Sequence, residues 1–297
     1  MKRIKITSLI TLFFLLCISC SDEWLKPDPL SFFAPENIYV DAAGFEAGLV
    51  RCRKEMNAEN HGYQNPIAVD VMYTDIAVPL RQSDFTQNTP SLVQQVPLVL
   101  TIFSSFYGYI KNANTIISRI DNITWTDEGL RNRILSEALW FRAYWYYRLV
   151  HTYGDIPWVG EELTGAKLDY YSTSRWAILG KLQEDLEYAV KWLPITSGVP
   201  GNVTKGAANH LLAKIYLANC EFDKAVSATT EVINGPYALM KERFGVDANK
   251  KWHNVMWDLH RYQNKNISAN KETIYATVDR PEAPTETWWS NPGTYSM

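Results

Sequence analysis

The thiols of Cys17 and Cys20 are the most reactive groups in the first part of the sequence, and they lie three positions apart. A Cys-x-x-Cys pair does redox or metal chemistry when it sits beside a strand and a helix. Here the pair ends an apolar segment, residues 6–18, that follows three basic residues. Thirteen residues are too few for a membrane-crossing helix, which needs about 20. The pattern is typical of a secretory signal peptide, so we reject the redox interpretation.

The chemistry that fits this thiol pair is lipidation of the second cysteine. Cys17-Ile18-Ser19-Cys20 resembles a bacterial lipoprotein box, with Cys17 where Leu is usual. We therefore expect a signal peptide over residues 1–19, Cys20 as the lipidated first residue of the mature chain, and a tether over residues 20–35. The acidic run 21–23 resembles the export signal of surface lipoproteins, which predicts a lipid-anchored protein on the outer face of the outer membrane. The alternative is a plain secreted protein cut near residue 19.

Carboxylate and imidazole groups offer little catalytic chemistry. The sequence contains no HExxH, GxSxG or GxGxxG motif and no phosphate-binding glycine loop. Adjacent acids such as Glu184-Asp185 do not converge on one site when they lie on a helix. His253 and His260 lack a third ligand of the kind that a metal site needs. We expect no enzyme activity, no metal and no cofactor.

Composition and charge favour a soluble globular protein that does not bind nucleic acid. Of 297 residues, 46% are hydrophobic and 21% are charged. Without residues 1–19 the chain carries 26 basic and 32 acidic residues, a net charge of −6. Nucleic acid would require a clustered positive surface, and anionic lipid would also attract positive charge. Cys52 and Cys220 could form a disulfide, but their apolar neighbours favour two buried free thiols.

Helices are predicted to position the remaining residues. Apolar residues recur with a 3.6-residue period over 99–120 and 127–150, and Gly154 should end the second helix. A third helix should begin after the capping residue Ser174 and stop before Pro194. Two more should span 204–219 and 222–233. The long stretch 57–90 is irregular, and loops of that length are usually functional or disordered.

The last two predicted helices carry the spacing of a tetratricopeptide repeat. Leu212, Ala213, Tyr216 and Ala225 stand at the positions that this repeat requires. Small residues among them allow close helix packing. An ordinary helical hairpin is the alternative, and the repeat alone would imply only an interaction scaffold.

Several longer blocks together resemble one family, the SusD/RagB outer-membrane lipoproteins. The resemblance spans nearly the whole mature chain but corresponds to the N-terminal half of the family's proteins. The blocks are FSSFYGYIKNANTIISRID (103–121), LSEALWFRAYWYYRLVHTYGDIPWV (135–159), TKGAANHLLAKIYLANCEFDKAVSATTEVINGPYAL (204–239) and NKETIYATV (270–278).

The resemblance implies an all-α domain of tetratricopeptide-like repeats over residues 36–297, truncated relative to the family. It further implies a protein that captures oligosaccharides at the cell surface as the lid of a SusC-like TonB-dependent transporter, without catalysis.

Thr273, Ile274 and Tyr275 favour a strand over residues 272–278, whose partners would lie largely in the missing half. An unpaired strand is unstable in water, so we expect the last 50 residues to be poorly ordered or aggregation-prone.

Sugar recognition predicts where the ligand contacts should lie. Sugars present apolar faces that stack on aromatic rings, and hydroxyl groups that need polar partners. The irregular segments 57–90 and 284–295 supply both. The candidate glycan-binding residues are Tyr73, Asp75, Arg81, Asp84, Phe85, Asn88, Trp288 and Trp289. For the Trp pair, burial against the missing half is an equal alternative.

Two functions stay open at this point. One is a glycan-capturing lipoprotein, and the other is a tetratricopeptide-type scaffold lipoprotein that binds proteins only. Aromatic residues in exposed loops favour the first, whereas aromatic residues in a concave helical groove favour the second. Arg142, among five aromatic neighbours, is interpreted as structural, with its guanidinium paired to a buried carboxylate.

Overall fold

The computed structural model describes residues 35–59, 97–199 and 201–277. Contacts divide the chain into two units, residues 1–38 and 39–297. In the first unit only the short helix α2 (Pro35–Ile38) is described. No helix among the described ranges is long and apolar enough to span a bilayer.

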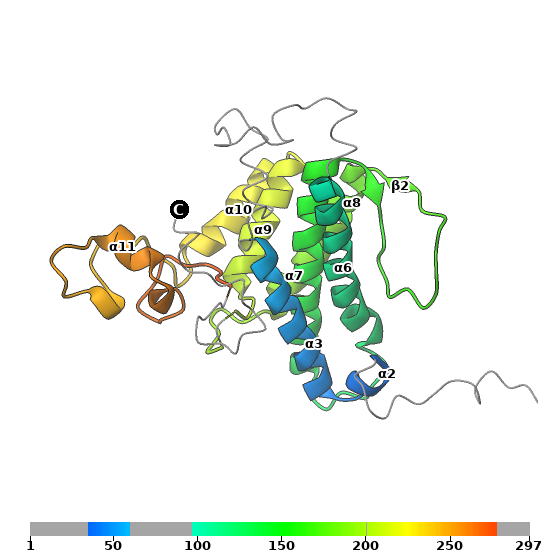
Figure 1. Cartoon of the computed structure of the whole chain (residues 1–297), viewed down its shortest axis with the longest axis horizontal. Helices are drawn as coiled ribbons and strands as arrows, with labels where there is room; N and C mark the ends of the chain where they lie inside the picture. The colour runs from blue at the N-terminus through cyan, green and yellow to red at the C-terminus, as the bar shows by residue number, and fades with distance from the viewer. Residues whose placement is uncertain (1–34, 60–96, 200, 278–297) are drawn as a thin grey trace, which may run out of the picture. The chain divides into compact units, whose positions relative to one another are not determined.

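The second unit is mostly helical, which confirms the all-α prediction (Figure 1). Its long helices are α3 (Ala42–Glu55), α6 (Pro97–Arg119), α7 (Glu128–Tyr153), α8 (Arg175–Trp192), α9 (Lys205–Ala218) and α10 (Phe222–Ile233). Shorter elements are the 3₁₀ turns η1 (Met56–Glu59), η3 (Gly245–Asp247) and η4 (Tyr262–Asn264), the helix α11 (Val255–His260), and the strands β1 (Ile156–Pro157) and β2 (Ser172–Thr173). The two strands pair antiparallel, with Ile156 opposite Thr173.

Capping side chains fix the helix boundaries close to where the sequence places them. Ser174 Oγ accepts a hydrogen bond from Trp176 N at 3.3 Å, which starts α8 as predicted. Asp127 Oδ1 accepts from Leu130 N at 3.0 Å and starts α7. Gly154, at φ +77°, ends α7 in a conformation that residues with a Cβ avoid. The local chemistry of these residues therefore determines the helix lengths.

Helix α7 is the centre of the core, and α3, α6, α8 and α9 pack around it. The predicted apolar face is confirmed, and residues on its other sides are buried too. Trp145 and Tyr146 are fully buried, and the Trp145 ring lies 4.8 Å from that of Phe106 in α6. Tyr146 Oη accepts from Val159 N at 2.7 Å, so its polar end is satisfied. Burial on every side explains why α7 has no polar face of its own.

Arginine–carboxylate pairs join α7 and α6 to the neighbouring elements. Arg53 of α3 donates to both carboxylate oxygens of Glu137 at 2.7 and 3.0 Å. Removing one partner of such a pair leaves a buried charge, which costs about 3–5 kcal/mol. Further pairs of this kind include Arg142–Asp185 at 2.7 Å, Arg148–Glu59 at 2.8 Å and Arg119–Glu162 at 2.6 Å.

Helices α9 and α10 form the hairpin that the tetratricopeptide spacing predicts. The four residues that carry the spacing are all buried. Glu221 N donates to Tyr216 O at 2.8 Å and closes the turn between the helices. Tyr216 Oη donates to Glu187 of α8 at 2.9 Å, so the hairpin is also tied to the preceding helix.

Two predictions fail. Residues 272–277 form no strand, because no described strand lies beside them to accept their backbone hydrogen bonds. Cys220 is exposed, because it occupies the turn between α9 and α10 at φ +60°. Cys52 is buried as predicted, and both thiols are free. The expectation that the last 50 residues are poorly ordered or aggregation-prone stays a prediction, since residues 278–297 lie outside the described residues.

Candidate functional site

A cavity lies between two loops of the second unit. The first loop, residues 193–204, connects α8 to α9, because Pro194 cannot continue α8. Lys205 N donates to Pro194 O at 2.8 Å and brings the two ends of this loop together. Within it, Val199 N donates to Ser197 Oγ at 3.1 Å. Gly201 takes φ +85°, which a residue with a Cβ rarely adopts.

The opposite wall is residues 265–276, and Asn270 organises it. The buried Asn270 side chain accepts from Glu272 N at 3.1 Å and Thr273 N at 3.3 Å, and it donates to Asn264 O at 3.1 Å. Asparagine holds turns in this way because its amide imitates the backbone. Ala238 N donates to Lys271 O at 3.0 Å, which joins the wall to the segment after α10.

Tyr237 forms the side of the cavity next to α9. Its hydroxyl shares a hydrogen bond of 2.9 Å with Thr204 Oγ1, the side chain that caps α9. The ring lies against the backbone at Gly206, where a Cβ atom would be 2.6 Å from Tyr237 Cζ and closer still to Cε2 and the hydroxyl oxygen of the same side chain. Only glycine leaves room for the ring here. The two ends of one block of the family resemblance, residues 204–239, are thus in direct contact.

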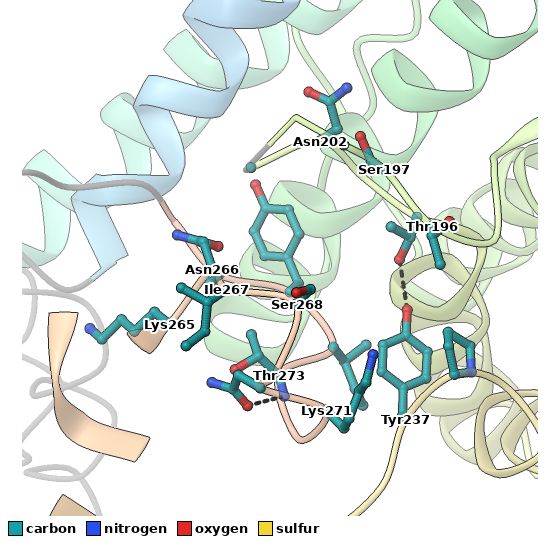
Figure 2. Close-up of a pocket in the computed structure, with 18 of the residues that line it drawn as sticks. Thr196, Ser197, Asn202, Tyr237, Lys265, Asn266, Ile267, Ser268, Lys271 and Thr273 are labelled. Carbon is teal, nitrogen blue, oxygen red and sulfur yellow. Dashed lines mark hydrogen bonds between the residues drawn. The ribbon is translucent and has the colours of Figure 1, made fainter. Parts of the chain in front are cut away.

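The space enclosed by these residues, which we call the loop cavity, measures about 360 Å³. That volume is at the lower end of the range for small-molecule sites, about 300–1,000 Å³. Figure 2 shows that Thr196, Ser197 and Asn202 come from one side and Ser268, Lys271 and Thr273 from the other. Ile195, Val199, Ile267 and Ile274 supply apolar surface, and Tyr237 and Tyr275 supply the two rings.

Tyr275 contributes its ring to the wall of the loop cavity. The ring packs on Trp140 of α7 at 4.9 Å between centroids, so α7 supports it from behind. Its hydroxyl is buried beneath this wall, out of reach of a ligand in the cavity, and has no hydrogen-bond partner among the described residues. Burial raises the pKa of Tyr275 well above its usual range, so the hydroxyl stays protonated.

The loop cavity is equipped to bind a small polar molecule. Hydroxyl, amide and ammonium groups lie beside two tyrosine rings and several aliphatic side chains. This is the mixture that a sugar ring requires, since sugars combine apolar faces with hydroxyl groups. No carboxylate belongs to the lining residues, which are all among the described ones.

The residues predicted as ligand contacts lie outside the described residues. This holds for Tyr73, Asp75, Arg81, Asp84, Phe85, Asn88, Trp288 and Trp289, and for the lipidation residue Cys20. They stay predictions. The loop cavity was missed because its walls are about 70 residues apart in sequence. The available signals were Tyr237 and Tyr275, which the family blocks contain but to which no binding role was given.

Arg142 is structural, as predicted. It donates to both carboxylate oxygens of Asp185 in α8, at 2.9 and 2.7 Å, and to Gly160 O at 2.9 Å. Its guanidinium also lies 5.4 Å from the ring centre of Trp158. The guanidinium is thus occupied on every edge by the scaffold itself.

His253 does not pair with His260. Its ring stacks on Trp257 at 4.0 Å, while His260 Nδ1 contacts Met256 O at 2.7 Å. Across the described ranges, no three His, Cys, Asp or Glu side chains are grouped as metal ligands.

A family model described as starch-binding and associating with the outer membrane, SusD-like, matches residues 40–217. Two proteins of Formosa agariphila, SusD-like proteins P2 and P25, are 29% and 24% identical to this chain over 240 and 277 residues. The alignments cover 79% and 86% of this chain but 46% and 52% of those proteins. The chain therefore spans about half the length of these relatives.

Solved structures with the same fold include SusD-like proteins. One from Bacteroides fragilis superposes with a TM-score of 0.64 at 19% identity, covering 85% of this chain and 46% of that one. Another, described as a laminarin-binding SusD-like protein, gives a TM-score of 0.59 at 23% identity, covering 69% and 47%. At these identities the likeness concerns the fold.

Proposed function

Because the chain belongs to the SusD-like family, whose model matches residues 40–217, we propose that it captures oligosaccharides at the cell surface and passes them to a SusC-like TonB-dependent transporter. The family match is the observation that carries this proposal. One structure of the same fold is described as binding laminarin, a glycan, which supports the same class of ligand.

The loop cavity is the proposed contact with sugar within the described residues. Tyr237 and Tyr275 offer rings, and Thr196, Ser268 and Lys271 offer donors to sugar hydroxyls. Residues in the segments 57–90 and 284–295 are proposed as further contacts, with Tyr73, Phe85 and the Trp288-Trp289 pair as stacking surfaces.

The proposed location is the outer membrane, with the protein held there by a lipid on Cys20. The mature chain has a net charge of −6, so attraction to anionic lipid heads does not supply the attachment. Replacing Cys20 by Ala should move the protein from the membrane fraction to the soluble fraction. A Cys20→Ala protein that stays with the membrane would contradict lipid anchoring.

Calorimetric titration tests the binding proposal. The purified full chain, kept in detergent, is titrated with a panel of plant, fungal and host oligosaccharides. A ligand of the loop cavity should lose roughly tenfold in affinity in Tyr237→Ala, which removes one ring of the cavity wall. Tyr262→Ala, at an exposed tyrosine outside the lining residues, is the matched control and should bind as the parent does.

The outcomes separate the two functions. Binding of a sugar with the expected loss in Tyr237→Ala supports capture at the loop cavity. Binding that is unchanged in this variant would move the site to the other proposed contacts. If no sugar binds to the folded protein, the protein-binding scaffold becomes the better interpretation.

A further inference from the structure

The charges on the loop cavity are of one sign. Its only charged lining residues are Lys265 and Lys271, both exposed, and no ion pair of either residue occurs within the described part of the chain. The lining residues include no aspartate or glutamate. A ligand inside therefore meets positive charge that no lining carboxylate neutralises.

Nearby carboxylates are directed elsewhere. Glu272, next to Lys271 in sequence, accepts from Met240 N at 2.9 Å on the side of the segment after α10. Glu137 lies behind Tyr275 but is paired with Arg53 at 2.7 Å and Arg133 at 3.2 Å. Glu137 is thus neutralised by arginines, and neither acid forms an ion pair with the two lysines at the loop cavity.

The two lysines differ in position. Lys271 lies beside the segment that carries Tyr237, because Ala238 N donates to Lys271 O at 3.0 Å, whereas in Figure 2 the Lys265 side chain extends away from the other labelled residues. Lys271 is thus placed to contact a ligand that lies on Tyr237, and Lys265 adds positive potential at the edge. A charge-assisted hydrogen bond from an ammonium to an anion is about twice as strong as a neutral one.

We propose that the loop cavity selects an anionic saccharide, in which a carboxylate or sulfate group binds Lys271 while the sugar ring lies against Tyr237. The volume of about 360 Å³ limits the enclosed part to one or two sugar units. The inference rests on the proposed function, since it names the class of sugar that the same cavity takes.

Three probes of equal length test the proposal: an oligogalacturonate, a sulfated galactan oligosaccharide without carboxylates, and a neutral galactan oligosaccharide. Each is titrated calorimetrically into the purified full chain at low and at physiological salt. At least one anionic probe should bind ten times more tightly than the neutral one, and its advantage should shrink as salt rises. The first two probes distinguish a carboxylate from a sulfate as the recognised group.

The variant Lys271→Gln should lower the affinity for the anionic probe about tenfold and leave the neutral probe unchanged. Lys265→Gln should have a smaller effect, through the potential alone. Lys251→Gln is the matched control, because Lys251 is also exposed but lies outside the lining residues. Circular dichroism confirms that each variant is folded.

Other outcomes are equally informative. If the neutral probe binds as tightly as the anionic ones, or if Lys271→Gln keeps the selectivity, the charge proposal is overturned and sugar capture stands. If none of these probes nor any glycan of the wider panel binds to the folded chain, the proposed function fails, and this inference fails with it.

Discussion

Replacing Gly206 by Ala tests the contact that forms one side of the loop cavity. A methyl group there would lie 2.6 Å from Tyr237 Cζ and closer to Cε2 and the hydroxyl oxygen, so the side chain must move. Displacing it breaks the 2.9 Å hydrogen bond to Thr204 Oγ1. Overpacking costs about 1–3 kcal/mol and the lost hydrogen bond about 0.5–1.5 kcal/mol. Alanine is also the better helix former, which offsets up to about 1 kcal/mol.

The net expectation is that Gly206→Ala lowers the free energy of unfolding by about 1–3 kcal/mol. Urea unfolding followed by circular dichroism measures it, with the midpoint compared at equal slope. The decisive measurement is the same change in a Tyr237→Ala protein. Without the ring, the methyl group meets no obstacle, and Gly206→Ala should become neutral or stabilising. The reasoning is refuted if Gly206→Ala leaves the free energy of unfolding unchanged when Tyr237 is present, or lowers it by the same amount when Tyr237 is absent.

Asp185→Asn should lower the free energy of unfolding by about 3–5 kcal/mol, because the buried Arg142 loses its charged partner. The control Glu184→Gln, on the exposed side of α8, should change it by less than about 0.5 kcal/mol. Denaturant unfolding of both variants measures the two effects. Burial raises the pKa of Glu55 from 4.5 to about 7, so folding favours the neutral carboxyl group. The contribution of this neutral group to the free energy of unfolding is fully present below about pH 4.5 and is lost as the pH rises through 7. Stability should thus fall by roughly 2–3 kcal/mol between pH 5 and pH 8, and Glu55→Gln should show a smaller fall; equal falls in parent and variant would contradict this. In protein that starts at residue 21, a thiol reagent should label Cys220 quickly and Cys52 only on unfolding, because Cys220 is exposed and burial raises the pKa of the Cys52 thiol well above its usual value; two fast thiols in the native state would contradict the structure.

Local chemistry made the helices predictable from sequence. Ser174 starts a helix and Gly154 ends one through contacts within one helical turn, and the apolar periodicity indicates which face of a helix is buried. The five predicted helices therefore agree with α6 to α10 to within a few residues. The strand over 272–278 was wrong because the β-propensity of Thr273 to Tyr275 has no effect without a neighbouring strand. Cys220 was misplaced because its apolar neighbours belong to the two helices and not to the turn between them.

The binding site was less predictable, because it depends on tertiary contacts. The walls of the loop cavity meet only when residue 237 packs over Gly206 and Asn270 holds its turn, and neither event follows from a local pattern. The candidate ligand residues were chosen from their residue types and from their place in irregular segments, and they stay predictions. The role of Arg142 could be predicted because a guanidinium among many rings on a core helix needs a carboxylate, whichever helix supplies it.

The ion pairs that connect α7 to its neighbours also fix how far each helix can slide along it. A shift by one helical turn, about 5.4 Å, would carry Glu137 away from Arg53 and Asp185 away from Arg142 while both acids remain inside the protein. Apolar side chains would tolerate such a shift with modest losses, but stranded charges would not. The ion pairs therefore favour one register of the helices and penalise compact states in which the helices are wrongly aligned. They also make α3, α7 and α8 open as one cooperative unit, since releasing any one of these helices exposes the charges of another.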